Sequence, residues 1–367
     1  MKNIIRTAPA VFAVGDNYQI MVEVTCPTLM WVKVGGEEYF DDSNGIIRSA
    51  VTTHRIIVPK NELDAAGGYT LFARKIIERK PYFSLTEDPV SEHFDFFPVK
   101  PGKTIAYQIA DAHNMVAAPV AACKRFEEKY GKIDFLIMNG DVPDHSGRIE
   151  NFHNIYEIAA DITGGTKPVI FSRGNHDTRG IYAENIAEHT PVENGNSFFE
   201  ATLGDIHMII LDCGEDKADW HAEYGNTVCC HAFRKRETAW LEKLTSAPGI
   251  KDAKHRVVIA HNPFTWVHHA PFDIEADTYG YWSKLLRERF APEIFIAGHL
   301  HTLEISRPGD ENDWLGHPCT VVSGSLPEHG RDGNPDEFAG SGFIFDDGVT
   351  VIFNDNLGKY QFTETKI

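Results

Sequence analysis

The segment VIFSRGNHD, residues 169–177, joins a short apolar run to a cluster of polar side chains. Val169 to Ser172 has the length and composition of a buried β-strand. Gly174-Asn175-His176-Asp177 follows it, and Asn, His and Asp are residue types that bind metals. The segment before it, Arg148 to Ile162, has Ile and Phe side chains recurring on one face at helical spacing. A helix followed by a buried strand is the unit of an α/β fold.

The same unit recurs through the rest of the chain. Helical stretches such as Glu237 to Thr245 and Tyr281 to Phe290 alternate with short apolar runs, which predicts an α/β fold with buried strands. The runs are Thr104 to Ala110, Phe135 to Met138, Val169 to Ser172, Met208 to Leu211, Val257 to Ala260, Ile294 to Ala297, Thr320 to Val322, Phe343 to Phe345 and Val349 to Phe353.

Metal-binding residue types follow most of the first six runs. Because the carboxyl ends of strands in an open α/β sheet converge on one crevice, we expect these segments to meet. They are Asp111-Ala112-His113, Gly140-Asp141-Val142-Pro143-Asp144, Gly174-Asn175-His176-Asp177, His261, and Gly298-His299-Leu300-His301. Mixed imidazole and carboxylate ligands suit one or two transition ions. The glycines before Asp141, Asn175 and His299 allow sharp backbone turns beneath the ligands.

Residues 18–97 have a different pattern. Short apolar runs alternate with turn signals such as Ser43-Asn44-Gly45, and no helical period is evident, so this region predicts an all-β sandwich. The predicted strands are Tyr18 to Thr25, Leu29 to Val34, His54 to Val58, Tyr69 to Ile77 and Phe94 to Phe97. The proline-rich segment Pro98 to Gly102 predicts a linker. We therefore predict a β-sandwich domain over residues 1–100 and an α/β domain over residues 101–367.

The composition limits the class of function. The 367 residues include 53 Asp and Glu against 35 Lys and Arg, a formal net charge of -18. This charge repels polyanions, so we expect no nucleic-acid partner, which disfavours a nuclease. No apolar run approaches the roughly 20 residues that span a bilayer. Residues 1–15 lack a signal-peptide pattern, so we expect a cytoplasmic protein, with a trimmed secreted protein as the alternative.

As a set, the motifs D-x-H, G-D-x-x-D, G-N-H-D, H and G-H-x-H resemble those of the calcineurin-like metallophosphoesterases, over roughly Thr104 to Phe353. The resemblance implies an α/β/β/α sandwich, two metal ions (Mn, Fe or Zn) and hydrolysis of phosphate esters. One metal would be held by Asp111, His113 and His301, and the second by Asn175, His261 and His299, with Asp141 bridging the two. By the same resemblance, His176 would assist the leaving group and Asp144 would orient His176.

Elementary chemistry is consistent with these roles. Two ions about 3.5–4 Å apart lower the pKa of a shared water towards 7 and clamp the phosphoryl oxygens. The departing alkoxide then needs a proton, and a histidine beside a carboxylate, such as His176 beside Asp144, is suited to donate it. Asp144 could instead support a metal ligand. Both interpretations make Asp144 functional.

The predicted N-terminal sandwich resembles, more loosely, the fibronectin-like domain that precedes the catalytic domain of purple acid phosphatases. Those enzymes carry a tyrosine three residues after the bridging aspartate, where this chain has Asp144. No tyrosinate is therefore available at that position for ferric iron, and Fe(III) is not assumed.

Further residues near the motifs are candidate substrate contacts, because loops after sheet strands build such sites. They are Asn114, Arg148, Arg173, Phe264, Trp266 and His268. Arg148, Arg173 and Arg179 lie near the motifs and could contact phosphate bidentately, with surface salt pairing as an alternative of at least equal weight. For the aromatic residues, packing in the core is an equal alternative. The segment Ser323 to Gly342 is either a lid over the site or a plain loop.

We therefore predict a metal-dependent phosphoesterase that acts on a small phosphorylated substrate, with phosphomonoesters slightly favoured. A phosphodiesterase acting on cyclic nucleotides or lipid head groups is the alternative within enzymes. A non-catalytic protein-binding scaffold, as in a retromer subunit, is the alternative of another class. The presence of His176 and of every expected ligand disfavours the scaffold. The oligomeric state is left open.

Overall fold

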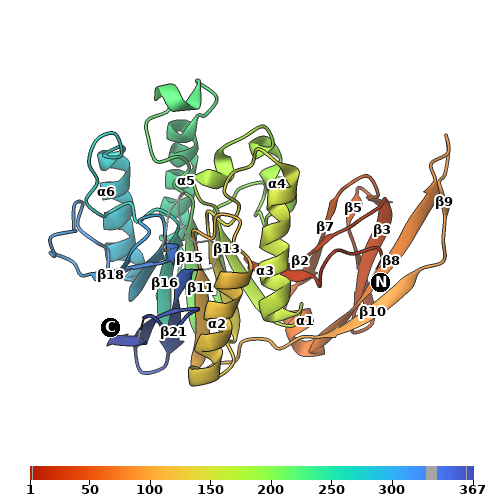
Figure 1. Ribbon diagram of the computed structural model, residues 1–367, viewed down its shortest axis with the longest axis horizontal. Helices are drawn as coiled ribbons and strands as arrows, with labels where there is room; N and C mark the ends of the chain where they lie inside the picture. Colours follow the sequence, from red (N-terminus) through yellow and green to blue (C-terminus); the bar gives the residue numbers. More distant parts are fainter. Residues whose placement is uncertain (2, 328–336, 361) are drawn as a thin grey trace.

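The computed structural model describes residues 1, 3–327, 337–360 and 362–367. Its N-terminal strands lie at one end of the long axis and α6 (Ala276–Leu285) lies at the other (Figure 1). Two large β-sheets form the centre, as the predicted α/β/β/α sandwich requires. The strands of the first sheet, in spatial order, are β23 (Thr363–Lys366), β22 (Val349–Asp355), β21 (Phe338–Phe345), β11 (Thr104–Ile109), β12 (Phe135–Asn139), β13 (Pro168–Ser172), β1 (Ala10–Val14), β2 (Asn17–Glu23) and β7 (Thr53–Pro59), with β20 (Leu326–Pro327) paired to β21.

The second sheet lies between two hydrophobic cores. Alternate side chains of a strand point to opposite faces, so Ile210 packs into the core shared with the first sheet and Ile209 into the core on the other side. Its strands, in spatial order, are β14 (Phe199–Leu203), β15 (Ile206–Leu211), β16 (His255–Ala260), β17 (Ile294–Ala297), β19 (Thr320–Gly324) and β18 (Leu303–Ser306). Burial on both faces explains why these strands are continuous apolar runs.

Helices cover the outer faces of the two sheets. The helices α2 (Ala117–Tyr130) and α3 (His153–Thr163) contact strands of the first sheet, and Leu241 of α5 (Cys230–Leu244) and Trp282 of α6 pack into the outer core of the second. The predicted helix Arg148 to Ile162 is divided in the structure into a 3-10 turn, η1 (Ile149–Phe152), and the helix α3, which follows it directly. Short segments complete the domain: η2 (His176–Thr178), η3 (Ala183–Asn185), α4 (Ile186–His189), η4 (Ala222–Tyr224) and the π-helical η5 (Leu286–Phe290). Among the described residues, no helix is long and apolar enough to cross a membrane.

The N-terminal region is strand-rich, as predicted. Strands β1, β2 and β7 share a core with a further sheet, whose order is β10 (Val90–Asp95), β8 (Gly68–Glu78), β3 (Thr28–Val34) and β4 (Glu37–Phe40), with β9 (Leu85–Thr86) paired to β8. A separate pair is formed by β5 (Asp42–Ser43) and β6 (Ile46–Ile47). The short strands β4, β5, β6 and β9 had not been predicted, nor had β1 and the helix α1 (Lys60–Ala66), which ends at Gly67 in the left-handed conformation. The predicted strand Phe94 to Phe97 corresponds to β10, which begins and ends earlier in the chain.

Strand β1 joins the two predicted domains through hydrogen bonds. It pairs in parallel with β13, with Val11 opposite Pro168 and Phe12 opposite Val169. The first sheet therefore contains strands from both sides of residue 100. Whether residues 1–100 and 101–367 act as separate domains stays a prediction.

Candidate metal centre

The loops after β11, β12, β13, β16 and β17 bring the predicted ligands together. Five ligands adopt the left-handed backbone conformation, which is unfavourable for side chains other than Gly and Asn: Asp111, His113, Asp141, His299 and His301 have φ between 43° and 68°. Backbone strain of this kind costs about 1–3 kcal/mol per residue and clusters at functional sites. The concentration of strain in these loops therefore marks the site independently of the side chains.

Of the three glycines before the ligand positions, only Gly140 uses a positive φ, of 77°. A Cβ on Gly140 would also lie 2.6 Å from Cγ of His261. For Gly298 the constraint is space, since a Cβ there would lie 2.7 Å from that of Ala110. The predicted sharp turn is confirmed at Gly140, and close approach explains Gly298.

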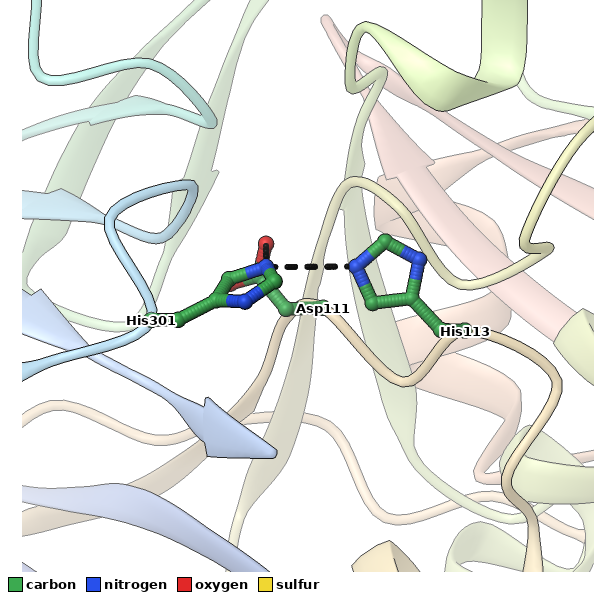
Figure 2. Close-up of side chains that lie close together, drawn as sticks. All are labelled: Asp111, His113 and His301. Atoms are coloured by element: carbon green, nitrogen blue, oxygen red, sulfur yellow. Dashed lines mark hydrogen bonds and ion pairs between the residues drawn. The ribbon is translucent and has the colours of Figure 1, made fainter. Parts of the chain in front are cut away.

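One group of ligand atoms is formed by Asp111, His113 and His301, whose candidate donor atoms lie within 4.8 Å of one another (Figure 2). Nε2 of His301 is 3.3 Å from Oδ1 of Asp111 and 3.2 Å from Nε2 of His113. The carboxylate of Asp111 is buried and also accepts a hydrogen bond from the backbone N–H of His299 at 3.0 Å. This hydrogen bond ties the loop after β11 to the loop after β17, which carries the G-H-x-H motif.

A second group is formed by Asp141, His261 and His299. Nε2 of His261 is 3.1 Å from Oδ2 of Asp141 and 3.6 Å from Oδ1 of Asp111. Oδ1 of Asn175 lies 2.9 Å from Nδ1 of His299, so the predicted amide ligand joins this group. All seven predicted ligands therefore lie at one place, and Asp141 also belongs to a third group with His113 and His176.

The donor set fits a metal ion. Nδ1 of His261 donates a hydrogen bond to the backbone carbonyl of Asn139 at 2.7 Å, which leaves the lone pair of the neutral ring on Nε2. That Nε2 atom is buried between the carboxylates of Asp141 and Asp111, and none of its contacts among the described residues has the geometry of a hydrogen bond. A buried acceptor of this kind is costly unless a cation or donor meets it.

Burial and charge act in opposite directions on these groups. Burial disfavours the charged form of Asp111 and Asp141, but the imidazoles around them, His261 above all, outweigh it and lower the pKa of both carboxyls. Burial likewise opposes protonation of His261, yet Asp141 and Asp111 raise its pKa to about 10. Burial and the neighbouring His261 lower the pKa of His299 to about 4. The protein thus holds ionised carboxylates that favour a positive charge between them.

His176 lies beside this cluster. Nδ1 of His176 donates a hydrogen bond to the backbone carbonyl of Asp144 at 2.7 Å, and its backbone N–H donates to Oδ1 of Asp141 at 2.8 Å. The carboxylate of Asp144 is farther away, with Oδ1 at 3.9 Å from Nδ1 of His176 and at 3.2 Å from Nδ1 of His113. The side chain of Asp144 is thus closer to a predicted metal ligand than to the histidine it had been predicted to orient.

The polar candidates for substrate contacts have different surroundings. Oδ1 of Asn114 accepts hydrogen bonds from the backbone N–H of Asp144 at 3.1 Å and from Nδ2 of Asn154 at 2.7 Å. Asn114 therefore connects the loop after β12 to the start of α3. Arg148 is exposed. Arg173 is paired with the buried Asp212, at 2.7 Å, and its guanidinium lies over the ring of Phe233. Arg173 therefore holds the loop that follows β15, in which Asp212 lies.

The aromatic candidates belong mainly to the core. Phe264 is fully buried, and its ring lies 5.0 Å from that of Phe295 and 5.6 Å from that of Trp282. Trp266 is buried in the same cluster. His268 is half-buried, with its ring edge-on to Trp314. For Phe264 and Trp266 the packing alternative therefore describes the structure. The predicted lid or loop, Ser323 to Gly342, lies partly in β19, β20 and β21, so its two ends are strands and not loop. Residues 328–336 of this segment lie outside the described residues.

Sequence analysis did not single out Asp177 or Glu215. The buried carboxylate of Asp177 accepts hydrogen bonds from the backbone N–H groups of Gly174 at 2.7 Å and Asp141 at 3.3 Å, and burial together with Asp141 raises its pKa to about 7. Asp177 stands in the motif itself. Glu215 follows the apolar run of β15, which was the signal available for it.

Comparisons with known proteins agree with this geometry. The structure is similar to that of a purple acid phosphatase, PPD1, from yellow lupin (Lupinus luteus) seeds, with 13% identity and a TM-score of 0.61, covering 98% of this chain and 73% of that one. A predicted phosphoesterase from Streptococcus pneumoniae TIGR4 (11% identity) and Vps29 from Chaetomium thermophilum (12% identity) each match 72% of this chain, and 98% and 95% of their own, with TM-scores of 0.33. No curated protein sequence matches the chain. The family model for calcineurin-like phosphoesterases matches residues 106–303, so the chain belongs to this family of metal-dependent phosphoester hydrolases.

Proposed function

We propose that this phosphoesterase hydrolyses phosphate monoesters of small molecules at a pair of metal ions. Asp111, His113 and His301 would hold one ion, Asn175, His261 and His299 would hold the other, and Asp141 would contact both. The observation that carries this proposal is the position of Asp141, whose carboxylate is grouped with His261 and His299 and, separately, with His113. A carboxylate shared between two such groups is what a bridging ligand requires.

When bound, the ions would supply an activated water and would neutralise charge on the phosphoryl oxygens. The donor set, with imidazole, carboxylate and one amide, suits Mn, Fe or Zn. No tyrosine stands three residues after Asp141, so tyrosinate is not part of the proposed set at that position.

The chain's own contribution to bond cleavage is assigned to His176. Because Nδ1 donates to the carbonyl of Asp144, the other ring nitrogen, Nε2, is the one that exchanges a proton with the substrate. Burial, together with the positive charges of His113 and Arg179, lowers the pKa of His176, with Asp141 acting in the opposite sense. We propose that the protonated ring donates from Nε2 to the departing alkoxide.

The test uses the full chain, stripped of metal and reloaded separately with Mn²⁺, Zn²⁺ or Fe²⁺. Turnover of p-nitrophenyl phosphate is compared with turnover of bis(p-nitrophenyl) phosphate and of a 2′,3′-cyclic nucleotide. We expect metal-dependent turnover with the monoester preferred. A preference for the diesters would replace the monoesterase proposal by the phosphodiesterase alternative, and no turnover with any metal would contradict both. The cytoplasmic location also stays a prediction, with which the six unpaired cysteines are compatible.

A further inference from the structure

Arg179 is held in one orientation by the loop that follows β15. Its Nε donates to both carboxylate oxygens of Glu215, at 3.1 and 3.2 Å, and its Nη2 donates to Glu215 at 2.9 Å and to Asp216 at 3.1 Å. The side chain of Glu215 is only 1% exposed. Burial opposes the charge on Arg179, but Glu215 and Asp216 outweigh it and raise the pKa of the guanidinium. The orientation is therefore fixed and the charge permanent.

The remaining nitrogen of the guanidinium, Nη1, points at His176. Nη1 of Arg179 lies 3.3 Å from Nε2 of His176 and 3.9 Å from a carboxylate oxygen of Glu223. Since Nδ1 of His176 already donates to the carbonyl of Asp144, Nε2 accepts from Arg179 when the ring is neutral. Nη1 therefore lies next to Nε2, the atom that must contact the leaving oxygen if His176 protonates it.

Arg179 also borders an open cavity. Together with Thr178, Ile181, Tyr224 and Glu223, Arg179 lines a cavity of about 550 Å³. Thr178 connects the cavity wall to the motif, because its hydroxyl oxygen lies 2.8 Å from both the backbone carbonyl oxygen of Asn175 and a carboxylate oxygen of Glu215, and its single hydrogen can serve either acceptor. The guanidinium therefore stands between the metal centre and an open space.

We propose that Arg179 is a substrate-binding residue of this site: its Nη1 group donates a hydrogen bond to a phosphoryl oxygen on the side of His176, and Glu215 positions it. This inference rests on the proposed function for the location of the phosphate. Carboxylates neutralise the opposite side of the guanidinium, so the contribution is a directed hydrogen bond more than a long-range attraction.

The experiment measures the dissociation constant of inorganic phosphate by calorimetry on the metal-loaded protein, a measurement that needs no turnover. For Arg179→Ala we expect weaker phosphate binding by about 10–100-fold, the usual effect of losing a hydrogen bond to a charged group. KM for the monoester should rise with it. Arg179→Lys should recover only part of the lost phosphate affinity, because an ammonium group cannot form bidentate hydrogen bonds with Glu215 and also reach the phosphate. Glu215→Gln should weaken phosphate binding less than Arg179→Ala does.

Metal content and melting temperature are measured on every variant. The matched control is Arg125→Gln, which removes a partly buried arginine paired at 2.9 Å with Asp355, away from the ligand loops, and should leave phosphate binding unchanged. An unchanged phosphate dissociation constant in Arg179→Ala, or loss of metal from it, would overturn the inference. If Arg179→Ala does not fold, Arg179→Lys decides by the same criterion. If the wild type binds phosphate but turns over no ester, the proposed function fails while the test of Arg179 still stands.

Discussion

The carboxylate of Asp144 lies 3.2 Å from Nδ1 of His113 and 3.9 Å from Nδ1 of His176. Because Nε2 of His113 faces His301 in the first ligand group, Asp144 lies behind a proposed metal ligand, on the far side of its ring. Carboxylates in this position fix the orientation of the imidazole and make it a stronger ligand. For His176 the corresponding partner is a backbone carbonyl, which no substitution of a side chain removes.

Asp144→Asn should therefore act mainly on metal binding. We expect a loss of affinity of about 10–100-fold, the usual effect of removing such a supporting group, confined to one of the two ions. Metal titration followed by elemental analysis measures it. Asp161→Asn, at an exposed position of α3, is the matched control for the lost charge. Full metal content combined with a selective loss on poor leaving groups would instead return Asp144 to the role of orienting His176.

His176→Ala should reduce turnover in proportion to the need for a proton on the leaving group. For alkyl phosphates we expect a loss in the range of about 10²–10⁴, and for activated aryl phosphates a much smaller one. His93→Ala, at an exposed position of β10, is the control. Metal content is measured in parallel, because His176 also has a ligand atom within 4.8 Å of those of His113 and Asp141. An emptied metal site would make His176 a ligand.

Asp141→Asn should weaken both metal sites at once. The asparagine keeps the shape of the side chain but removes the negative charge that two cations would share, so each loses charge compensation. Elemental analysis after dialysis should show reduced occupancy of both ions and little turnover. Two tightly bound ions with near-normal activity would exclude Asp141 as the bridge.

Acid stability should depend on His189, the last residue of α4, which belongs to none of the ligand motifs. His189 is buried against Phe152 and Thr53, and burial lowers its pKa to about 4. Between pH 6.5 and pH 4 the unfolded chain binds a proton at this residue while the folded protein does not, so stability falls as the pH is lowered through this range. The contribution to the free energy of unfolding is at most about 3.4 kcal/mol, from 1.36 kcal/mol per pKa unit.

Urea unfolding of the wild type and of His189→Gln at pH 4.5, 5.5, 6.5 and 7.5 tests this expectation. The variant should be less stable at pH 7.5 but should lose less stability on acidification than the wild type. Parallel curves for the two proteins would show that His189 does not contribute to the acid sensitivity.

The order of apolar runs and polar motifs was enough to predict the sheets and to predict that the seven candidate ligands lie together at their edge. A run such as Val169 to Ser172 followed by Gly174 to Asp177 is local information, and parallel strands necessarily bring their carboxyl ends together. The strand-rich character of residues 18–97 was likewise local, although the helix α1 was missed. Strand β1 escaped prediction, because its five buried residues are stabilised by pairing with β13, more than 150 positions away.

Only the tertiary structure decided how these side chains face one another. Asp144 is about 30 positions from both His113 and His176, so the sequence does not show which of the two its carboxylate approaches. The two distances, 3.2 Å to His113 and 3.9 Å to His176, differ by less than an ångström, and only the folded loops set that difference. The pair of Arg179 and Glu215 spans 36 positions and two loops. Phe264 follows a ligand closely, yet it points into the core because the loop turns there. The sequence by itself determined which residue types gather at the strand ends, since that follows from local periodicity. The direction of each ring nitrogen and carboxylate depends on loops packed against each other, which no local pattern encodes.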